Sequence, residues 1–344
     1  MGQLILGIET SCDETSAAVV EEGLAVRSVV TATQFDLHAK YGGIVPEIAS
    51  RAHIENLLPV LTEAMDRAKV NFSDLAAVAV ANRPGLIGSL VIGLTSAKTI
   101  AWSKSLPLVA VDHVLAHTYS PALDRALPGY PAMALVVSGG HTSIYHLEGP
   151  TEAIRVGATT DDAAGEAFDK VAAILELGFP GGPAIDRLAQ KGDPRALKLP
   201  RAWLGKRSLD FSFSGIKTAV LYKVRGYPKK VPPPALTQQG KADLAASFQQ
   251  AVLEVLVGKL ERALNRYPAK MILCGGGVSA NSGLRAGLDS LGRRLDLPVW
   301  MPPMTYCTDN AAMIAGLAHH HAIARDFADL DVPALATTTL PRQR

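Results

Sequence analysis

Two histidines four residues apart, His113 and His117, have the residue type and spacing of metal ligands. In a helix, residues i and i+4 lie on one face, about 5–6 Å apart between their Cβ atoms. Both imidazoles can therefore reach one metal ion. Val114 stands where the helix of a zinc protease carries its glutamate base, which argues against peptide hydrolysis. From this motif alone, a packing role for the two rings is as well favoured as a metal site.

A third ligand would decide between these roles, and Asp309 is the best candidate. It lies far downstream, at a second strand-to-helix turn in the predicted structure. Two histidines and one carboxylate leave coordination positions open on a metal, an arrangement that suits iron(II) or a catalytic zinc. We therefore predict a mononuclear metal site made by His113, His117 and Asp309.

The predicted elements place the histidine pair at the start of a helix. A strand is expected over residues 106–111, and Asp112 has the side chain and position of a helix N-cap. Strand and helix patterns alternate along the chain, which indicates an α/β fold. Other expected elements are strands at 4–8, 17–20 and 75–81 and helices at 46–65 and about 90–104.

One pattern occurs twice, which indicates a duplicated domain. The strand, polar turn and strand at residues 4–20 recur at 132–147. Two such halves facing each other would hold the phosphates of a nucleotide between backbone N–H groups. We predict a first domain at 1–124 with the histidine pair, and a second at 130–344. The last helix is expected to pack back on the first domain.

Several features of the second half indicate adenosine binding. A strand runs into a triple-glycine turn that ends at Asn281, whose amide offers both a donor and an acceptor. Glu166 and Asp169 either project into the predicted cleft or complement a helix dipole. Asp186, in the first turn of another predicted helix, either bonds a ribose diol or caps that helix.

Composition gives weaker information about partners and location. The net charge is only +2, so no strong electrostatic footprint requires a nucleic-acid ligand. Three widely spaced cysteines without a Cys-x-x-Cys pair favour a reducing compartment, with Cys274 and Cys307 as buried small apolar residues. The chain begins with a strand and lacks an apolar run of roughly 18 residues, so we expect a cytoplasmic protein without a membrane span.

Two further segments have predicted positions. The proline-rich stretch 226–239 is expected to be an extended surface loop, and the run His319–His321 is expected at the surface rather than on a metal. Lysines and arginines at 198–207 precede an alternation of aromatic and hydroxyl residues at 211–218. This basic cluster is more typical of a solvated face than of a nucleic-acid contact.

The motifs taken together resemble the TsaD family, the tRNA threonylcarbamoyladenosine transferases. They follow the order of that family over nearly the whole chain. They are residues 7–16, His38 with Gly42 and Gly43, 46–53, the His113/His117 pair, 137–142, 165–170, 180–183, 211–218, 276–281 and 307–310.

This resemblance implies the actin/hexokinase/Hsp70-like (ASKHA) fold, with two ribonuclease-H-like halves around a nucleotide cleft. It implies that His113, His117 and Asp309 bind one iron(II), or alternatively zinc. It also implies an adenine nucleotide or threonylcarbamoyl-AMP in the cleft, contacted by a set of strand-end and helix-start residues. These are Val136, Val137, Ser138, Gly139, Gly140, Asp169, Gly182, Asp186 and Asn281.

The implied reaction moves a threonylcarbamoyl group from threonylcarbamoyl-AMP to N6 of the adenosine 3′ to the anticodon in ANN-decoding tRNAs, with release of AMP. Asp13 and Glu14 are the candidates for taking the amine proton, and a role in stabilising the first hairpin is an equal alternative. The implied partners are tRNA, a TsaB-like subunit and a TsaE-like ATPase. One departure is Arg83, where the family usually has glycine; it puts the shape of this loop in question.

Three other functions are compared with this one. A metalloprotease lacks its glutamate base. An ATPase or small-molecule kinase of the same fold needs only magnesium on carboxylates, which leaves the two histidines without a role. A non-catalytic paralogue would be expected to have lost part of the ligand set. The transferase is therefore the predicted function.

Overall fold

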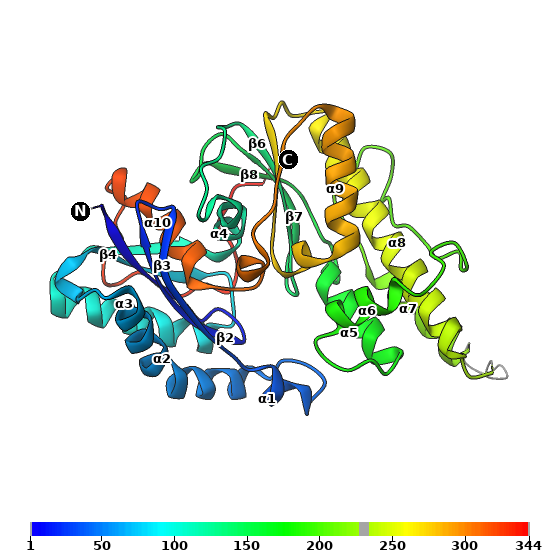
Figure 1. Ribbon diagram of the computed structural model, residues 1–344, viewed down its shortest axis with the longest axis horizontal. Helices are drawn as coiled ribbons and strands as arrows, with labels where there is room; N and C mark the ends of the chain where they lie inside the picture. Colours follow the sequence, from blue (N-terminus) through cyan, green and yellow to red (C-terminus); the bar gives the residue numbers. More distant parts are fainter. Residues whose placement is uncertain (1, 227–233, 343–344) are drawn as a thin grey trace. The chain divides into compact units, whose positions relative to one another are not determined.

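The computed structural model describes residues 2–226 and 234–342 of the 344-residue chain. The described chain divides into two compact units, each built on its own five-stranded sheet (Figure 1). Unit 1 comprises the chain up to Gly129 together with Leu147–Ala153 and Pro302–Pro341. Unit 2 comprises Tyr130–His146, Ile154–Met301 and Arg342.

The sheet of unit 1 has the strand order β3-β2-β1-β4-β5. Strand β1 pairs antiparallel with β2 and parallel with β4, and β4 pairs parallel with β5. Strands β1 and β4 are central and nearly fully buried, because their sequences are continuous apolar runs. The strands are β1 (Leu4–Glu9), β2 (Glu14–Glu21), β3 (Ala25–Thr33), β4 (Leu75–Arg83) and β5 (Leu108–Asp112).

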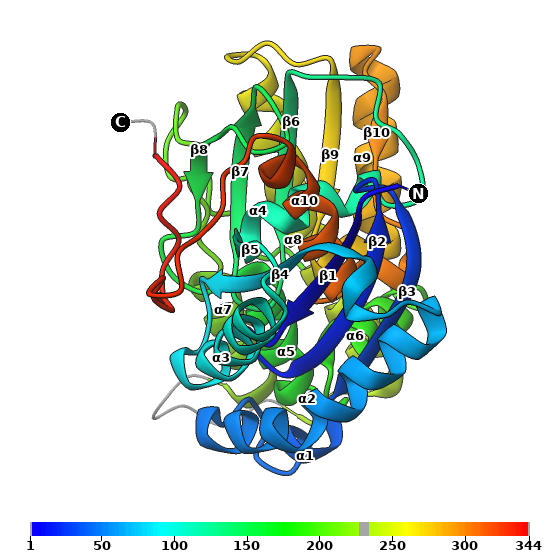
Figure 2. The ribbon, with the colours of Figure 1, turned by 90° about the vertical axis from the view of Figure 1, so that its left-hand side faces the viewer.

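Helices cover both faces of this sheet. Helices α2 and α3 pack on one face, and α10 lies against the other, where it also contacts α4 (Figures 1 and 2). The helix α10 comes from the end of the chain, so the core of unit 1 closes with residues distant in sequence. The helices of this unit are α1 (Phe35–Ala39), α2 (Pro46–Ala68), α3 (Ile87–Lys104), α4 (His113–Tyr119) and α10 (Ala311–Ile323), with short 3₁₀ turns at Phe72–Asp74, Ser120–Ala122 and Met304–Tyr306.

The sheet of unit 2 has the order β10-β9-β6-β7-β8, with β6 parallel to β9. Because these two strands are parallel, their carboxyl ends meet at one edge of the sheet, with Val136 opposite Gly275. The strands are β6 (Ala132–Val137), β7 (Thr142–Leu147), β8 (Ala153–Ala158), β9 (Met271–Gly275) and β10 (Val299–Trp300). The helices are α5 (Ala164–Ile174), α6 (Gly181–Ala189), α7 (Ser214–Arg225), α8 (Gln238–Leu264) and α9 (Ser282–Leu295), with a 3₁₀ turn at Gly277–Ala280.

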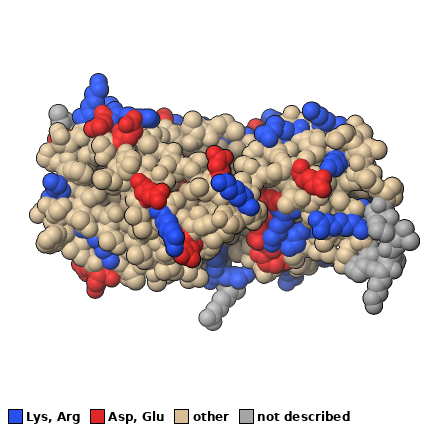
Figure 3. All heavy atoms as spheres, turned by 90° about the horizontal axis from the view of Figure 1, so that it is seen from below, with Lys and Arg blue, Asp and Glu red and all other residues tan. Residues whose placement is uncertain are grey.

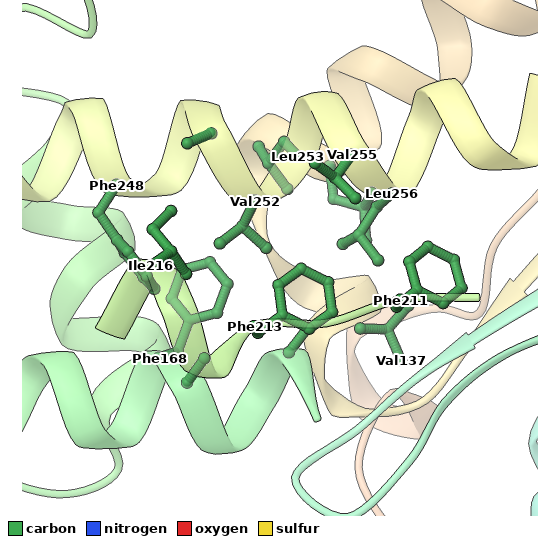
Figure 4. Close-up of a cluster of buried hydrophobic side chains, with 14 of the residues drawn as sticks. Val137, Phe168, Phe211, Phe213, Ile216, Phe248, Val252, Leu253, Val255 and Leu256 are labelled. Atoms are coloured by element: carbon green, nitrogen blue, oxygen red, sulfur yellow. The ribbon is translucent and has the colours of Figure 1, made fainter. Parts of the chain in front are cut away.

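The aromatic and hydroxyl alternation at 211–218 is explained by the core of unit 2. Phe211 and Phe213 are buried against side chains of α8, as Figure 4 shows. The alternate residues Ser212 and Ser214 instead donate their hydroxyls to Asp161 at 2.5 and 2.8 Å. The two phenylalanines therefore belong to the core, and the two serines bond the start of α7 to Asp161.

The run His319–His321 is wrongly predicted as surface: His319 is buried and the other two are half-buried, because α10 packs on the sheet. Ile54 and Leu58, two large apolar residues of α2, are 68% and 72% exposed. In the proline-rich stretch, residues 227–233 lie outside the described residues.

Composition-based expectations are partly tested. Cys274 and Cys307 are buried, as predicted. Lys and Arg side chains lie beside Asp and Glu on the face in Figure 3, in keeping with the small net charge. Within the described part of the chain, no helix combines the length and apolar character needed to cross a membrane.

Candidate functional site

The histidine pair lies on α4, whose start is fixed by its N-cap. Asp112 ends β5, and its Oδ1 accepts the backbone N–H groups of Val114 and Leu115 at 3.0 and 3.1 Å. These bonds satisfy two N–H groups that have no partner within the helix. Both histidines are buried, and the cap prediction is confirmed.

The three predicted ligands come together in unit 1. Nε2 of His117 lies 3.0 Å from Oδ1 of Asp309, and Nε2 of His113 lies 3.6 Å from the same oxygen. One ligand atom from each residue falls within 4.8 Å of the others. The i, i+4 spacing and the distant carboxylate therefore converge at one point, as a mononuclear metal site requires.

The chemistry of these donors fits a divalent metal. Burial lowers the pKa of His117, which keeps its imidazole in the neutral form that binds metal. Its buried Nδ1 has no hydrogen-bond partner among the described residues, whereas its Nε2 contacts Asp309. Burial also disfavours charge on His113, but Glu9 and Asp309 outweigh it and raise its pKa to about 9. This excess of negative charge is what a bound cation would balance.

Glu9 is a member of the site that sequence reasoning missed. It ends β1, is fully buried, and its Oε2 lies 2.8 Å from Nδ1 of His113. A carboxylate on Nδ1 fixes the tautomer and leaves the Nε2 lone pair for a metal. The sequence signals were an ionisable residue at the end of an apolar strand and its place in the family motif at residues 7–16, and neither names His113 as its partner.

Replacing Glu9 with glutamine is expected to lower metal affinity by about 10–100-fold, the usual effect of losing a carboxylate behind a histidine ligand. The amide oxygen can accept a hydrogen bond from His113, but the amide nitrogen then faces the backbone N–H of Ser11. In wild type that N–H donates to Glu9, so the variant sets two donors against each other. Competition with a chelator, followed by elemental analysis, measures the change. Glu22→Gln is the matched control, because Glu22 is exposed. Equal metal affinity in wild type and Glu9→Gln would contradict this role.

Asp13 and Glu14 lie close to the metal-binding residues. Burial raises the pKa of both carboxyl groups, and the charge of Asp309 raises them further. A carboxyl with a raised pKa is a better base near neutral pH than an ordinary one. Their surroundings therefore suit proton transfer, and Glu14 also starts β2, as the hairpin alternative predicts.

A network of hydrogen-bonded polar side chains supports the turn that carries Asp13 and Glu14. Nε2 of His53 lies 3.0 Å from the carbonyl oxygen of Cys12, and its Nδ1 lies 2.8 Å from Oγ1 of Thr15. Gln34 continues the network to His38, whose Nε2 is 3.1 Å from Oε1 of Gln34. These residues, of which Thr15, His38 and His53 lie in the quoted motifs, hold the turn that carries Asp13 and Glu14.

Arg83, the departure from the family pattern, lies beside the cap of the metal helix. Its Nε is 3.5 Å from Oδ2 of Asp112, which also accepts the hydroxyl of Thr338 at 2.5 Å. The arginine therefore occupies the loop without displacing the cap that orients α4.

In unit 2, the predicted substrate residues of β6 form a tight turn. Val136 and Val137 end the strand and are buried, whereas Gly139 and Gly140 are exposed. Ser138 accepts the backbone N–H of His141 on Oγ at 3.1 Å, and its carbonyl accepts the N–H of Gly165 at 3.2 Å. The two exposed glycines leave backbone free of side chains, which suits close approach of a ligand.

The other predicted substrate residues are linked by hydrogen bonds to neighbouring helix starts. Oδ1 of Asp169 accepts the N–H of Gly181 at 2.7 Å, next to Gly182 at the start of α6. Asp186 of α6 accepts the N–H and hydroxyl of Ser282 at 3.1 and 2.8 Å. Glu166 instead pairs with Lys170 at 2.6 Å, which supports a structural role for it.

Asn281 caps α9, with its Oδ1 accepting the N–H of Leu284 at 2.9 Å. The preceding glycine turn reaches the β6 turn: a Cβ on Gly276 would lie 2.5 Å from the carbonyl oxygen of Val137. The glycine turn before Asn281 therefore lies against the end of β6, and both belong to unit 2. The metal-binding residues belong to unit 1.

Solved structures with little sequence similarity share the fold. HypF of T. kodakarensis is similar with a TM-score of 0.60 at 13% identity, over 94% of this chain and 48% of that one. Component A of the (R)-2-hydroxyglutaryl-CoA dehydratase of Acidaminococcus fermentans gives a TM-score of 0.54 at 16% identity, over 93% of this chain and 99% of that one. These likenesses confirm the predicted actin/hexokinase/Hsp70-like α/β fold.

Sequence comparison identifies much nearer relatives. The family model described as TsaD, tRNA N6-adenosine threonylcarbamoyltransferase, matches residues 25–316. A protein of that name from Moorella thermoacetica is 51% identical over 96% of this chain and 95% of its own length. Another from Halalkalibacterium halodurans is 47% identical over 96% and 94%. This chain therefore belongs to the TsaD family of tRNA N6-adenosine threonylcarbamoyltransferases.

Proposed function

We propose that the protein is an acyltransferase that moves a threonylcarbamoyl group from threonylcarbamoyl-AMP to N6 of the adenosine 3′ to the anticodon in ANN-decoding tRNAs. The observation that carries the proposal is the convergence of His113, His117 and Asp309 in a chain of this family. Near full-length relatives with 51% and 47% identity carry the name of this activity.

The bond changes of this reaction balance without a further reactant. A bond forms between the N6 nitrogen and the carbamoyl carbon, and the bond from that carbon to the phosphate oxygen breaks, so AMP leaves. The amine gives up one proton, for which Asp13 and Glu14 are the proposed acceptors, with burial raising the pKa of both. The exocyclic amine is a weak nucleophile, so the activated donor is required.

The residues of unit 1 would hold a single iron(II), with zinc as the alternative. A metal bound there supplies Lewis-acid polarisation of an acyl oxygen. Glu9 keeps Nε2 of His113 free to bind, and the Asp112 cap keeps both rings on one face of α4. The backbone groups of Ser138, Gly139 and Gly140 are proposed to bind the adenylate phosphate, where hydrogen-bond donors stabilise charge on the leaving group.

The direct test supplies the purified protein and its partner subunits with threonylcarbamoyl-AMP and an unmodified ANN-decoding tRNA. We expect threonylcarbamoyladenosine in the digested tRNA and AMP released in equal amount. A tRNA that lacks the target adenosine is the control. Nucleotide hydrolysis or small-molecule phosphorylation without tRNA modification would instead support the ATPase or kinase alternative.

We also propose that a TsaB-like subunit binds the exposed side of α2 and α3, with a TsaE-like ATPase acting on the complex. A groove of about 1180 Å³ lies between these helices and is lined largely by apolar side chains. Ile54, Leu58 and Val91 line it and are 68%, 72% and 45% exposed. An apolar patch of this kind is typical of a protein-binding surface. The family resemblance gives the occupant.

Replacing Leu58 with glutamate is therefore expected to weaken binding of the TsaB-like subunit by about tenfold or more, because a charge would be buried in an apolar interface. Pull-down titration with the purified subunit measures this, while metal content should not change. Ile323→Glu is the control, since Ile323 is 63% exposed and lies on α10, on the other face of the sheet. The proposal is wrong if Leu58→Glu binds the subunit as tightly as wild type.

A further inference from the structure

Gln249 is a buried polar side chain in unit 2 that lies outside every motif described above. It lies in the middle of α8 and is only 9% exposed. Its two amide atoms contact two different elements, Asp186 on α6 and Asn281 at the cap of α9. Both of these residues are predicted substrate contacts, and they are 95 positions apart in the sequence.

The donors and acceptors of this group can be assigned without conflict. Nδ2 of Asn281 donates to Oε1 of Gln249 at 2.8 Å, and Nε2 of Gln249 donates to Oδ1 of Asp186 at 3.1 Å. Since Oδ1 of Asn281 accepts from the α9 backbone at 2.9 Å, the orientation of its amide is fixed. The orientation of the Gln249 amide follows, because Asp186 offers only acceptors.

Asp186 and Asn281 each keep one hydrogen-bonding position that a ligand can use. A carboxylate has about four acceptor positions, and three on Asp186 are taken by Gln249, the Ser282 hydroxyl and the Ser282 N–H. The unused position is on Oδ2. Asn281 keeps one of its two N–H donors. The free acceptor position of Asp186 and the free N–H donor of Asn281 are thus held in fixed orientations on two side chains that Gln249 bridges.

We propose that Gln249 is a positioning residue that orients Asp186 and Asn281 for recognition of the ribose of the adenine nucleotide. A ribose hydroxyl can donate to the free position of Asp186, and a second oxygen or ring nitrogen can accept from Asn281. Gln249 makes no contact with the nucleotide itself. This inference rests on the proposed function, because it takes the adenylate as the ligand of unit 2.

The next residue of the same helix provides a matched control. Gln250 is only half-buried, and its Nε2 donates to Glu254 one helical turn away at 2.9 Å. Among the described residues, its side chain has no hydrogen bond to Asp186 or Asn281. The substitutions Gln249→Leu and Gln250→Leu therefore change the same residue type in the same helix, and only the first breaks the bridge.

The test measures binding of AMP and of 2′,3′-dideoxy-AMP to the intact chain by calorimetry. Wild type is expected to prefer AMP, because only AMP offers hydroxyls to Asp186. In Gln249→Leu, AMP affinity should fall by about tenfold to a hundredfold, the range for a broken buried hydrogen bond. The preference for AMP over the dideoxy analogue should largely disappear. Gln250→Leu should resemble wild type in both measurements.

A second substitution covers the case in which leucine prevents folding. Gln249→Glu has the same shape and still accepts from Asn281, but it sets a carboxylate against Asp186. It should also lose affinity and ribose preference. Melting temperature and metal content, measured on each variant, show whether the fold and unit 1 are intact.

Three outcomes would overturn the inference: no AMP binding by wild type, no preference for AMP over the dideoxy analogue, or a Gln249 variant that keeps both. The tRNA assay distinguishes failure of this inference from failure of the proposed function. Wild type that modifies tRNA while the Gln249 variants keep their ribose preference would overturn only the inference. Ribose preference that depends on Gln249, in a protein that modifies no tRNA, would support the inference and overturn the proposed function.

Discussion

Replacing His117 with alanine is expected to remove the bound metal and the transfer activity together. His117 is fully buried, and its Nε2 lies 3.0 Å from Oδ1 of Asp309, so the substitution deletes one of three converging ligands. The loss of metal affinity should exceed the roughly 10–100-fold effect of replacing a residue that hydrogen-bonds to a metal ligand. Elemental analysis of purified protein should show roughly one iron or zinc per chain in wild type and a trace in the variant.

The control for this experiment is His321→Ala. His321 is in the same unit, but its Nδ1 is bonded to Asp326 at 2.8 Å, outside the metal-binding residues. This variant should keep both the metal and tRNA modification. Full tRNA modification by metal-free His117→Ala would remove the case for a metal in the reaction and return the histidine pair to a packing role.

Replacing Gly276 with alanine is expected to destabilise unit 2 and to damage nucleotide binding. Gly276 has φ +89°, a conformation that residues with a Cβ rarely adopt, and the new Cβ would lie 2.5 Å from the carbonyl oxygen of Val137. Backbone strain and overpacking together should lower the free energy of unfolding by about 2–4 kcal/mol. Relief of the clash would move Val137 and the adjoining Ser138 turn.

Chemical denaturation and AMP calorimetry on the same samples measure both effects. Gly277→Ala is the matched control, because a Cβ at that neighbouring glycine meets nothing within 4 Å and its φ is not positive. It should leave the unfolding midpoint nearly unchanged. If both alanine variants unfold at the same denaturant concentration as wild type, the close approach of the two turns does not constrain the site.

Much of the metal site could be predicted from the sequence because its main geometry is local. The i, i+4 spacing of His113 and His117 on a capped helix fixes their relation without reference to the rest of the fold. Asp309 was found from its place at a strand-to-helix turn and from the family motif. Its distance of 3.0 Å from His117 depends on how α10 packs, which no spacing reveals.

Residues that act through long-range contacts could not be found in this way. Glu9 meets His113 across 104 positions, and Gln249 meets Asn281 across 32. Glu9 lies within the family motif at residues 7–16 and Gln249 lies in none of the quoted motifs, but neither position reveals its partner, since a buried glutamate and a glutamine within a long helix each have many ordinary roles. Sequence periodicity also cannot distinguish an apolar helix face that packs in a core from one that lines an exposed groove, as Ile54 and Leu58 do.

The same lack of tertiary information explains the error at His319–His321. Consecutive side chains point in different directions around a helix, which favoured a surface position over a metal site for the three histidines. Helix α10 nevertheless packs against strands of the unit 1 sheet, and His320 lies 3.0 Å from the hydroxyl of Tyr119. Burial lowers the pKa of His320 to about 4, so this side chain stays neutral inside the protein.

The discontinuity of unit 1 has a consequence for the order of events on the ribosome. Helix α10 and Asp309 belong to unit 1 but are made after almost all of unit 2. The first 129 residues therefore emerge with one face of their sheet uncovered and with two of three metal ligands. Unit 2 can complete its core earlier, which reverses the usual order in which the amino-terminal domain folds first. A newly made chain thus gains its metal-binding capacity among its last steps of maturation.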